Sequence, residues 1–176
     1  MILDRFLGAK PAAGPARGLY VGAVSRGREP ALYERMGAPD TVEGRFEILT
    51  LHLILLIDRL DRHEPAEAHA RQALFDVYVH DLDGALREMG VGDLAVGKRM
   101  RRLAEAFYGR AKAYEAAFES LPDQTQLRAL IARTVLDGAV DADPTALAAY
   151  VALCRVALAD CEAASLVAGA ARWPTP

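Results

Sequence analysis

The chain has 176 residues, which suits a single domain that buries its core without help from disulfides or metal ions. Apolar residues make up 52% of the chain and aromatic residues only 7%, so alanine, leucine and valine supply most of the core, a composition that favours helices. The net charge of -3 excludes a general attraction of the whole molecule to nucleic acid or to anionic lipid.

The first sixteen residues predict a flexible N-terminal arm, because Pro11, Gly14 and Pro15 interrupt any helix there. A helical domain is expected over residues 17–172, followed by a C-terminal tail of residues 173–176. Periodic apolar residues, capping residues and breaks at glycine or proline predict an all-α, single-domain bundle of about seven helices. The expected spans are 17–26, 30–36, 40–62, 66–89, 94–121, 122–136 and 143–172.

The helix expected from residue 40 begins with Asp40 as its N-cap and has Glu43 three positions on, a pattern typical of a capping box. It is apolar on two sides, which predicts a central position in the core. His52 has no second metal ligand in register, so we expect a buried histidine held by hydrogen bonds. Cys154 and Cys161 are separated by about 10 Å along one helix, too far for a disulfide, and are expected to be buried thiols.

The most apolar stretch spans residues 48–57, whereas a membrane-spanning helix needs about 20 such residues. No secretory signal is visible at the start of the chain. These features predict a cytoplasmic protein, and they leave open a peripheral contact with the inner membrane.

Residues 92–98 match the pattern G-x-x-x-x-G-K of a phosphate-binding loop. Arg99 stands where that loop needs serine or threonine to hold magnesium, and a predicted helix precedes it in place of a strand. We therefore interpret the segment as a corner between two helices, with Asp93 as the cap of the second. No Ser-His-Asp or Cys-His set can be argued from spacing, so neither a catalytic residue nor a cofactor is predicted.

His69, Asp76, His80 and Asp83 share one face of their helix. Asp76 and His80 have the four-residue spacing of two ligands on one helix, which leaves a metal-dependent helical enzyme as an alternative. No second helix offers a matching Glu-x-x-His set, and Asp83 is placed to pair with Arg87. A solvated or partner-facing surface is the preferred interpretation, and no metal site is predicted.

Six basic residues and a single acidic residue, Glu105, fall within residues 98–112. Such a patch is either a solvated helix face or a surface for RNA, for an anionic membrane or for an acidic partner. Few aromatic residues alternate with these charges, which argues against sequence-specific recognition of nucleic acid. The six residues are Lys98, Arg99, Arg101, Arg102, Arg110 and Lys112.

Four stretches of the chain closely resemble the ubiquinol–cytochrome c chaperone family, and the pairs Leu19-Tyr20 and Leu32-Tyr33 resemble its opening. The stretches are residues 40–53 (DTVEGRFEILTLHL), 72–76 (QALFD), 81–93 (DLDGALREMGVGD) and 106–110 (AFYGR). The similarity extends from about residue 17 to residue 137, and its most specific part is the run LREMGVGD at residues 86–93.

The resemblance implies a non-catalytic assembly chaperone for the cytochrome bc complex that binds newly made cytochrome b or its nascent chain. Mitochondrial members act with a small partner protein at the ribosome's polypeptide exit. This chain looks like a bacterial member, for which both of those contacts stay open.

We expect the partner to bind through an apolar groove formed by the helices over residues 42–62, 66–89 and 94–121, beside the basic patch. An alternative is that the patch tethers the chain to a ribosome or to the inner membrane surface. The residues expected to form or brace the partner-binding surface are Arg87, Glu88, Asp93, Lys98, Arg99, Arg101, Arg102, Tyr108 and Arg110.

Overall fold

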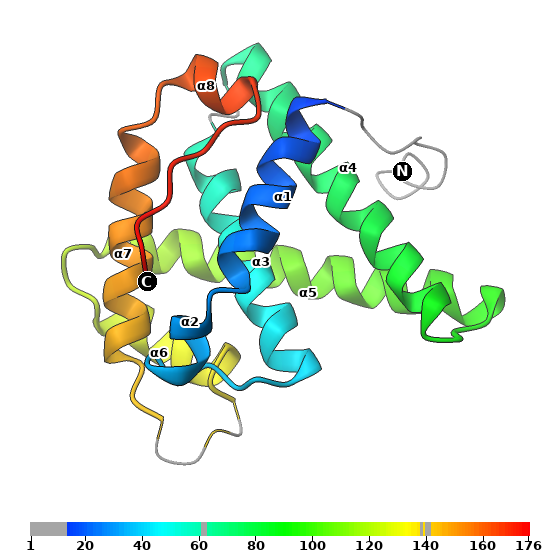
Figure 1. Cartoon of the computed structure of the whole chain (residues 1–176), viewed down its shortest axis with the longest axis horizontal. Coiled ribbons are helices and arrows are strands. Elements are labelled where there is room, and N and C mark those ends of the chain that lie inside the picture. Colours follow the sequence, from blue (N-terminus) through cyan, green and yellow to red (C-terminus); the bar gives the residue numbers. More distant parts are fainter. Residues whose placement is uncertain (1–13, 61–62, 138, 140–141) are drawn as a thin grey trace.

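The computed structural model describes residues 14–60, 63–137, 139 and 142–176, and all regular structure in these ranges is helical. The predicted all-α, single-domain fold is confirmed, with eight helices in the described residues (Figure 1). Residues 1–13 of the expected arm lie outside the described residues, and the first helix begins at Pro15. The helices are α1 (Pro15–Gly27), α2 (Pro30–Glu34), α3 (Val42–Arg59), α4 (Pro65–Glu88), α5 (Asp93–Glu119), α6 (Thr125–Thr134), α7 (Thr145–Ala159) and α8 (Ala163–Val167).

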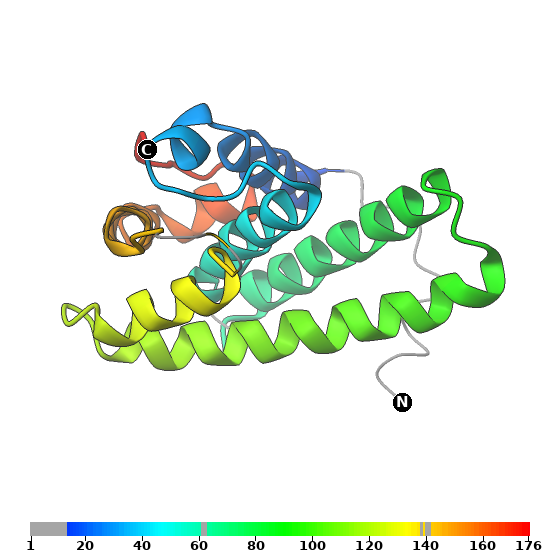
Figure 2. The ribbon, with the colours of Figure 1, turned by 90° about the horizontal axis from the view of Figure 1, so that it is seen from below.

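Helix α3 lies at the centre of the bundle, where α1, α5 and α7 pack against it. Its side chains from residue 48 to residue 57 are buried apart from the half-buried Leu49, which accounts for the apolar residues on two of its sides. Helices α4 and α5 form a long antiparallel pair, and the corner that joins them lies at one end of the molecule (Figure 2). Within the described residues, no helix is both long and apolar enough to cross a membrane.

Helix α8 returns the end of the chain to α1 and α4. The chain approaches α1 closely at two glycines, because a Cβ on Gly18 would lie only 2.8 Å from the carbonyl oxygen of Gly169, and a Cβ on Gly169 only 2.4 Å from that of Pro15. Gly169 has a φ of +90°, a conformation that side chains with a Cβ rarely adopt. The contact between α1 and the turn after α8 therefore depends on the absence of a side chain at both positions.

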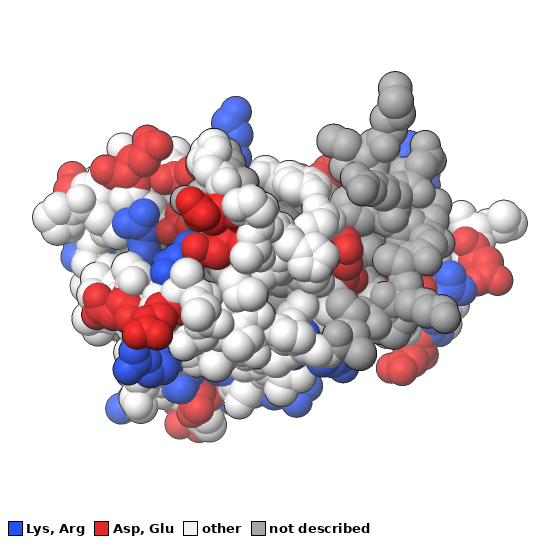
Figure 3. Space-filling model, turned by 90° about the horizontal axis from the view of Figure 1, so that it is seen from above, with Lys and Arg blue, Asp and Glu red and all other residues white. Residues whose placement is uncertain are grey.

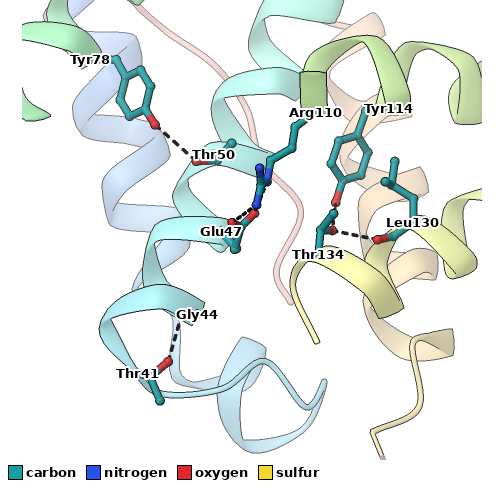
Figure 4. A network of polar contacts seen from close by, with 9 residues as sticks. All are labelled: Thr41, Gly44, Glu47, Thr50, Tyr78, Arg110, Tyr114, Leu130 and Thr134. Atoms are coloured by element: carbon teal, nitrogen blue, oxygen red, sulfur yellow. Dashed lines mark hydrogen bonds and ion pairs between the residues drawn. The ribbon is translucent and has the colours of Figure 1, made fainter. Parts of the chain in front are cut away.

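The N-cap of α3 is Thr41, so the prediction that Asp40 caps this helix is wrong. The Thr41 hydroxyl accepts a hydrogen bond from the N–H group of Gly44 at 3.1 Å (Figure 4). Asp40 instead pairs with Arg45, and the Oδ1 and Nε atoms lie 2.6 Å apart. A Cβ on Gly44 would lie 2.0 Å from the carbonyl oxygen of Pro39. Glycine at this position thus lets the loop before α3 fold tightly over the first turn.

The single helix predicted over residues 143–172 is wrong, because the chain breaks at residues 160–162 into α7 and α8. Arg59 of α3 stabilises the break. Its Nε atom donates to the carbonyl oxygen of Leu158 at 3.0 Å, and its Nη2 atom donates to that of Cys161 at 2.8 Å. These bonds engage carbonyl groups that the end of a helix exposes. Cys154 and Cys161 are both buried and free, as predicted.

The fully buried His52 is held through both of its ring nitrogens, which confirms the predicted structural role. Its Nδ1–H group donates to the carbonyl oxygen of Ile48 at 2.7 Å, and the Tyr150 hydroxyl donates to Nε2 at 3.0 Å. The ring of Trp173 packs edge-on against the imidazole, with a centroid distance of 5.3 Å. Burial lowers the pKa of His52 to about 4, so the imidazole is neutral at pH 7.

We expect His52 to make stability depend on pH between about 4 and 6.5. The unfolded chain protonates His52 at its ordinary pKa of 6.5, whereas the folded chain does so only at about 4. As the pH falls through this window, the unfolded state binds the extra proton, so stability that is fully present above pH 6.5 falls by about 3 kcal/mol. Urea unfolding of the wild type and of His52→Gln measures the effect, because the glutamine does not titrate. Parallel pH curves for the two proteins would contradict it.

Candidate partner-binding surface

The corner between α4 and α5 is built by a glycine cap and an arginine bridge. Gly90 has a φ of +80°, and its N–H group bonds the carbonyl oxygen of Arg87 at 2.9 Å. The Arg87 side chain donates to Asp83 from Nε at 2.6 Å and to Asp93 from Nη1. Asp93 is the first residue of α5 and Gly92 is the N-cap, so the prediction that Asp93 caps this helix is wrong. One arginine therefore joins the end of α4 to the start of α5.

Large apolar side chains are exposed at this corner. Leu94 is exposed to 102% and Met89 to 68% of their reference areas. Met89 is exposed because the corner extends beyond the other helices (Figure 2). Between residues 86 and 100, Val96 alone is buried. The corner therefore has little core of its own and offers apolar surface to solvent.

The predicted basic patch is divided in the structure. Arg110 turns toward α3, where its Nε and Nη2 atoms bind the carboxylate of Glu47 at 2.6 and 2.5 Å (Figure 4). Four other members are exposed and form no ion pair with any residue that the structure describes: Lys98, Arg99, Arg101 and Arg102. On the face shown in Figure 3, by contrast, acidic and basic side chains of the described residues are interspersed. Four basic side chains without an ion pair in the described residues thus lie close together in the first half of α5.

A cleft of about 680 Å³ lies where the end of α3 meets α4 and α5. Its floor consists of the buried aliphatic side chains of Ile54, Ile57 and Leu60. Its rim is mostly charged or polar, and Ala111 is the exception. The rim residues are Asp58, Arg59, His63, Arg71, Tyr108, Ala111, Lys112 and Glu115. A cleft is therefore present between these three helices, but its exposed lining is mostly polar, whereas an apolar groove was expected.

Tyr108 provides an aromatic surface on the rim of this cleft. Its ring centroid lies 5.3 Å from that of Phe75 and 6.2 Å from that of Phe107, which hold it against α4 and α5. The side chain remains 52% exposed, and partial burial raises the pKa of its hydroxyl. A ring that is both held in place and exposed can contact a partner at a low cost in side-chain entropy.

The four residues of the alternative metal site lie along one helix, α4. In the part of the chain that the structure describes, no group of three or more His, Cys, Asp or Glu side chains is placed to hold a metal ion. Asp76 accepts a hydrogen bond from Gln72 at 2.8 Å, and Asp83 binds Arg87. Residues 92–98 do not form a phosphate-binding loop. Gly97 lies within α5, and the pattern follows a helix, α4, where a phosphate-binding loop follows a strand. Both motifs are explained by ordinary helix surfaces.

Comparison with known proteins tests the resemblance found in the sequence. A family model described as ubiquinol-cytochrome C chaperone matches residues 34–173. The chain belongs to this family. The predicted resemblance is therefore confirmed, although the family match begins at residue 34 and not near residue 17, and it extends past residue 137 to include α7 and α8. A search of curated proteins found no match.

A solved structure of similar fold is the crystal structure of the Cbp3 homolog from Brucella abortus. The two chains share 35% of their residues, with a TM-score of 0.80. The match covers 90% of this chain and 88% of the Brucella chain, so nearly the whole helical bundle is common to both.

Proposed function

We propose that this chain binds newly made cytochrome b in the cleft between α3, α4 and α5. Membership of the ubiquinol–cytochrome c chaperone family gives it the function of an assembly chaperone for the cytochrome bc complex and implies a binding role without catalysis. The observation that carries the proposal is the cleft of about 680 Å³ with its apolar floor and exposed aromatic ring. This volume is in the range of pockets that hold small ligands, so it would accept side chains from one face of a helical segment.

The cleft combines the features that such a segment needs. Ile54, Ile57 and Leu60 lie beneath the cleft and are each at most 7% exposed, so the ring of Tyr108 at its edge offers the main apolar contact. Charged side chains around the floor can contact the polar ends of a membrane segment that has not yet entered the bilayer. This arrangement favours reversible binding, since charged rims add specificity and faster association more than affinity.

The expected site residues take different roles in this proposal. Tyr108 contacts the partner directly. Arg110 holds α5 against α3 through Glu47, and Arg87 holds the corner through Asp93. The remaining residues are exposed and lie toward the corner, outside the cleft, so we assign them to a different contact. They are Glu88, Lys98, Arg99, Arg101 and Arg102.

Site-specific photocrosslinking in cells tests the proposal. We expect a photoreactive amino acid at Tyr108 to form an adduct with cytochrome b. The same group at Val156, which is 60% exposed on α7, serves as the matched control and should form none. Equal adducts from both positions, or none from position 108, would contradict cytochrome b binding in the cleft.

Complementation of a deletion strain provides the functional readout. Deletion of the gene should lower the b- and c-type haem absorbance of isolated membranes. Ala111→Glu places a carboxylate on the wall of the cleft and should fail to restore it, whereas Ala116→Glu, on the exposed face of the same helix, should restore it. Normal haem spectra in the deletion strain would disprove the assembly function itself.

A further inference from the structure

The corner between α4 and α5 combines exposed apolar side chains with positive charge. Leu94 and Met89 are among the most exposed large apolar residues of the described chain, at 102% and 68%. Residues 86–102 carry five basic and two acidic side chains, although the whole chain has a net charge of -3. One of the two acids, Asp93, is already bound by Arg87. The free charge at this end of the molecule is therefore mostly positive.

Leu94 and three basic side chains share one face of α5. Three basic residues follow Leu94 by four, seven and eight positions, which places them on the same side of a helix with 3.6 residues per turn. The opposite side carries Val96 and Phe107, both of which are buried. The three basic residues are Lys98, Arg101 and Arg102.

We propose that this corner docks onto an anionic lipid surface. Leu94 and Met89 enter the headgroup region, and the basic residues that follow contact lipid phosphates. Both features stabilise binding to a lipid surface, because apolar side chains are buried at the acyl boundary and cations are attracted to anionic headgroups. Only the cations would stabilise binding to RNA, since RNA is recognised through its phosphates and through stacking of its bases on aromatic rings. The exposed leucine and methionine thus favour lipid over RNA.

Docking at the corner leaves the cleft free. Leu94 and Lys112 lie eighteen positions apart on α5, so about 27 Å separates the inserted end of the helix from the rim of the cleft. The inference goes beyond the proposed binding of cytochrome b and is tested without that protein, so either proposal can fail without the other. If both hold, the chaperone would present the cleft at the membrane surface.

Vesicle flotation with the full chain tests this inference. We expect binding to vesicles that contain about one-third phosphatidylglycerol and little binding to pure phosphatidylcholine. Binding should weaken steeply as salt rises from about 50 mM to about 500 mM. Leu94→Ser with Met89→Ser should weaken it about tenfold or more, because the apolar contribution is lost. The pair Leu153→Ser with Val156→Ser is the matched control, since these α7 residues are 59% and 60% exposed, and it should bind like the wild type.

A fluorophore at the corner separates lipid from RNA. Cys154 and Cys161 are buried, so Leu94→Cys provides a single exposed thiol for an environment-sensitive label. We expect a blue shift with anionic vesicles and none with ribosomal RNA. The inference is overturned if the chain does not float with anionic vesicles, if both serine pairs reduce binding equally, or if the label responds to RNA and not to vesicles.

Discussion

Arg59→Ala is expected to lower the free energy of unfolding by about 3–4 kcal/mol. The guanidinium donates to the carbonyl oxygens of Leu158 and Cys161 at 3.0 and 2.8 Å, and it binds the buried carboxylate of Glu67 at 3.0 Å. Hydrogen bonds to a charged group contribute about 1.5–3 kcal/mol each, and here one side chain links α3, α4 and the break between α7 and α8. Urea unfolding followed by circular dichroism measures the loss as a lower midpoint.

Two further variants separate this role from a general effect of losing an arginine. Arg59→Lys keeps the charge, but an ammonium cannot reproduce the planar geometry of the guanidinium, so we expect it to recover less than half of the loss. Arg99→Ala removes an exposed arginine that has no ion pair in the described residues and should change stability by no more than about 0.5 kcal/mol. Similar losses for Arg59→Ala and Arg99→Ala would rule out the linking role of Arg59.

Arg110→Met is expected to cost about 2–3 kcal/mol, because it leaves the carboxylate of Glu47 without its bidentate partner. The side chains of Glu47 and Arg110 are only 13% and 28% exposed, so water replaces the lost bonds incompletely. Glu47→Met should cost a similar amount for the same reason.

The double variant distinguishes a buried ion pair from two independent contacts. Replacing both residues with methionine removes both charges and should bring stability back to within about 1 kcal/mol of the wild type. The interaction energy from this double-mutant cycle is expected to be about 2 kcal/mol or more. A value below about 0.5 kcal/mol would mean that Arg110 does not depend on Glu47, and that it is available to a partner as first expected.

The three long helices were predicted from the sequence to within a few residues at each end. Expected spans of 40–62, 66–89 and 94–121 compare with α3 (Val42–Arg59), α4 (Pro65–Glu88) and α5 (Asp93–Glu119). Their apolar periodicity is long enough to outweigh local ambiguity. The break between α7 and α8 could not be predicted, because neither glycine nor proline marks it and Arg59, about 100 residues earlier in the chain, stabilises it.

The candidate site likewise depends on contacts between residues that lie far apart in the sequence. The sequence showed that basic residues cluster along one helix. It did not show that Arg110 is paired while its neighbours are exposed, since its partner Glu47 lies 63 residues earlier in the chain. Periodicity could not show that Met89 is exposed, because it reports which side of a helix is apolar and not whether another helix covers that side. The rim of the cleft combines α3, α4 and α5, so it required their arrangement in space.

The contact between Gly18 and Gly169 sets the order in which the bundle can be completed during synthesis. Helix α1 leaves the ribosome early, but the turn that closes over it is encoded about 150 residues later. At 5–20 residues per second, that interval lasts on the order of ten seconds. During this interval α1 of the nascent chain is only partly covered. Helix α8 and the turn after it then pack against helices that have already formed.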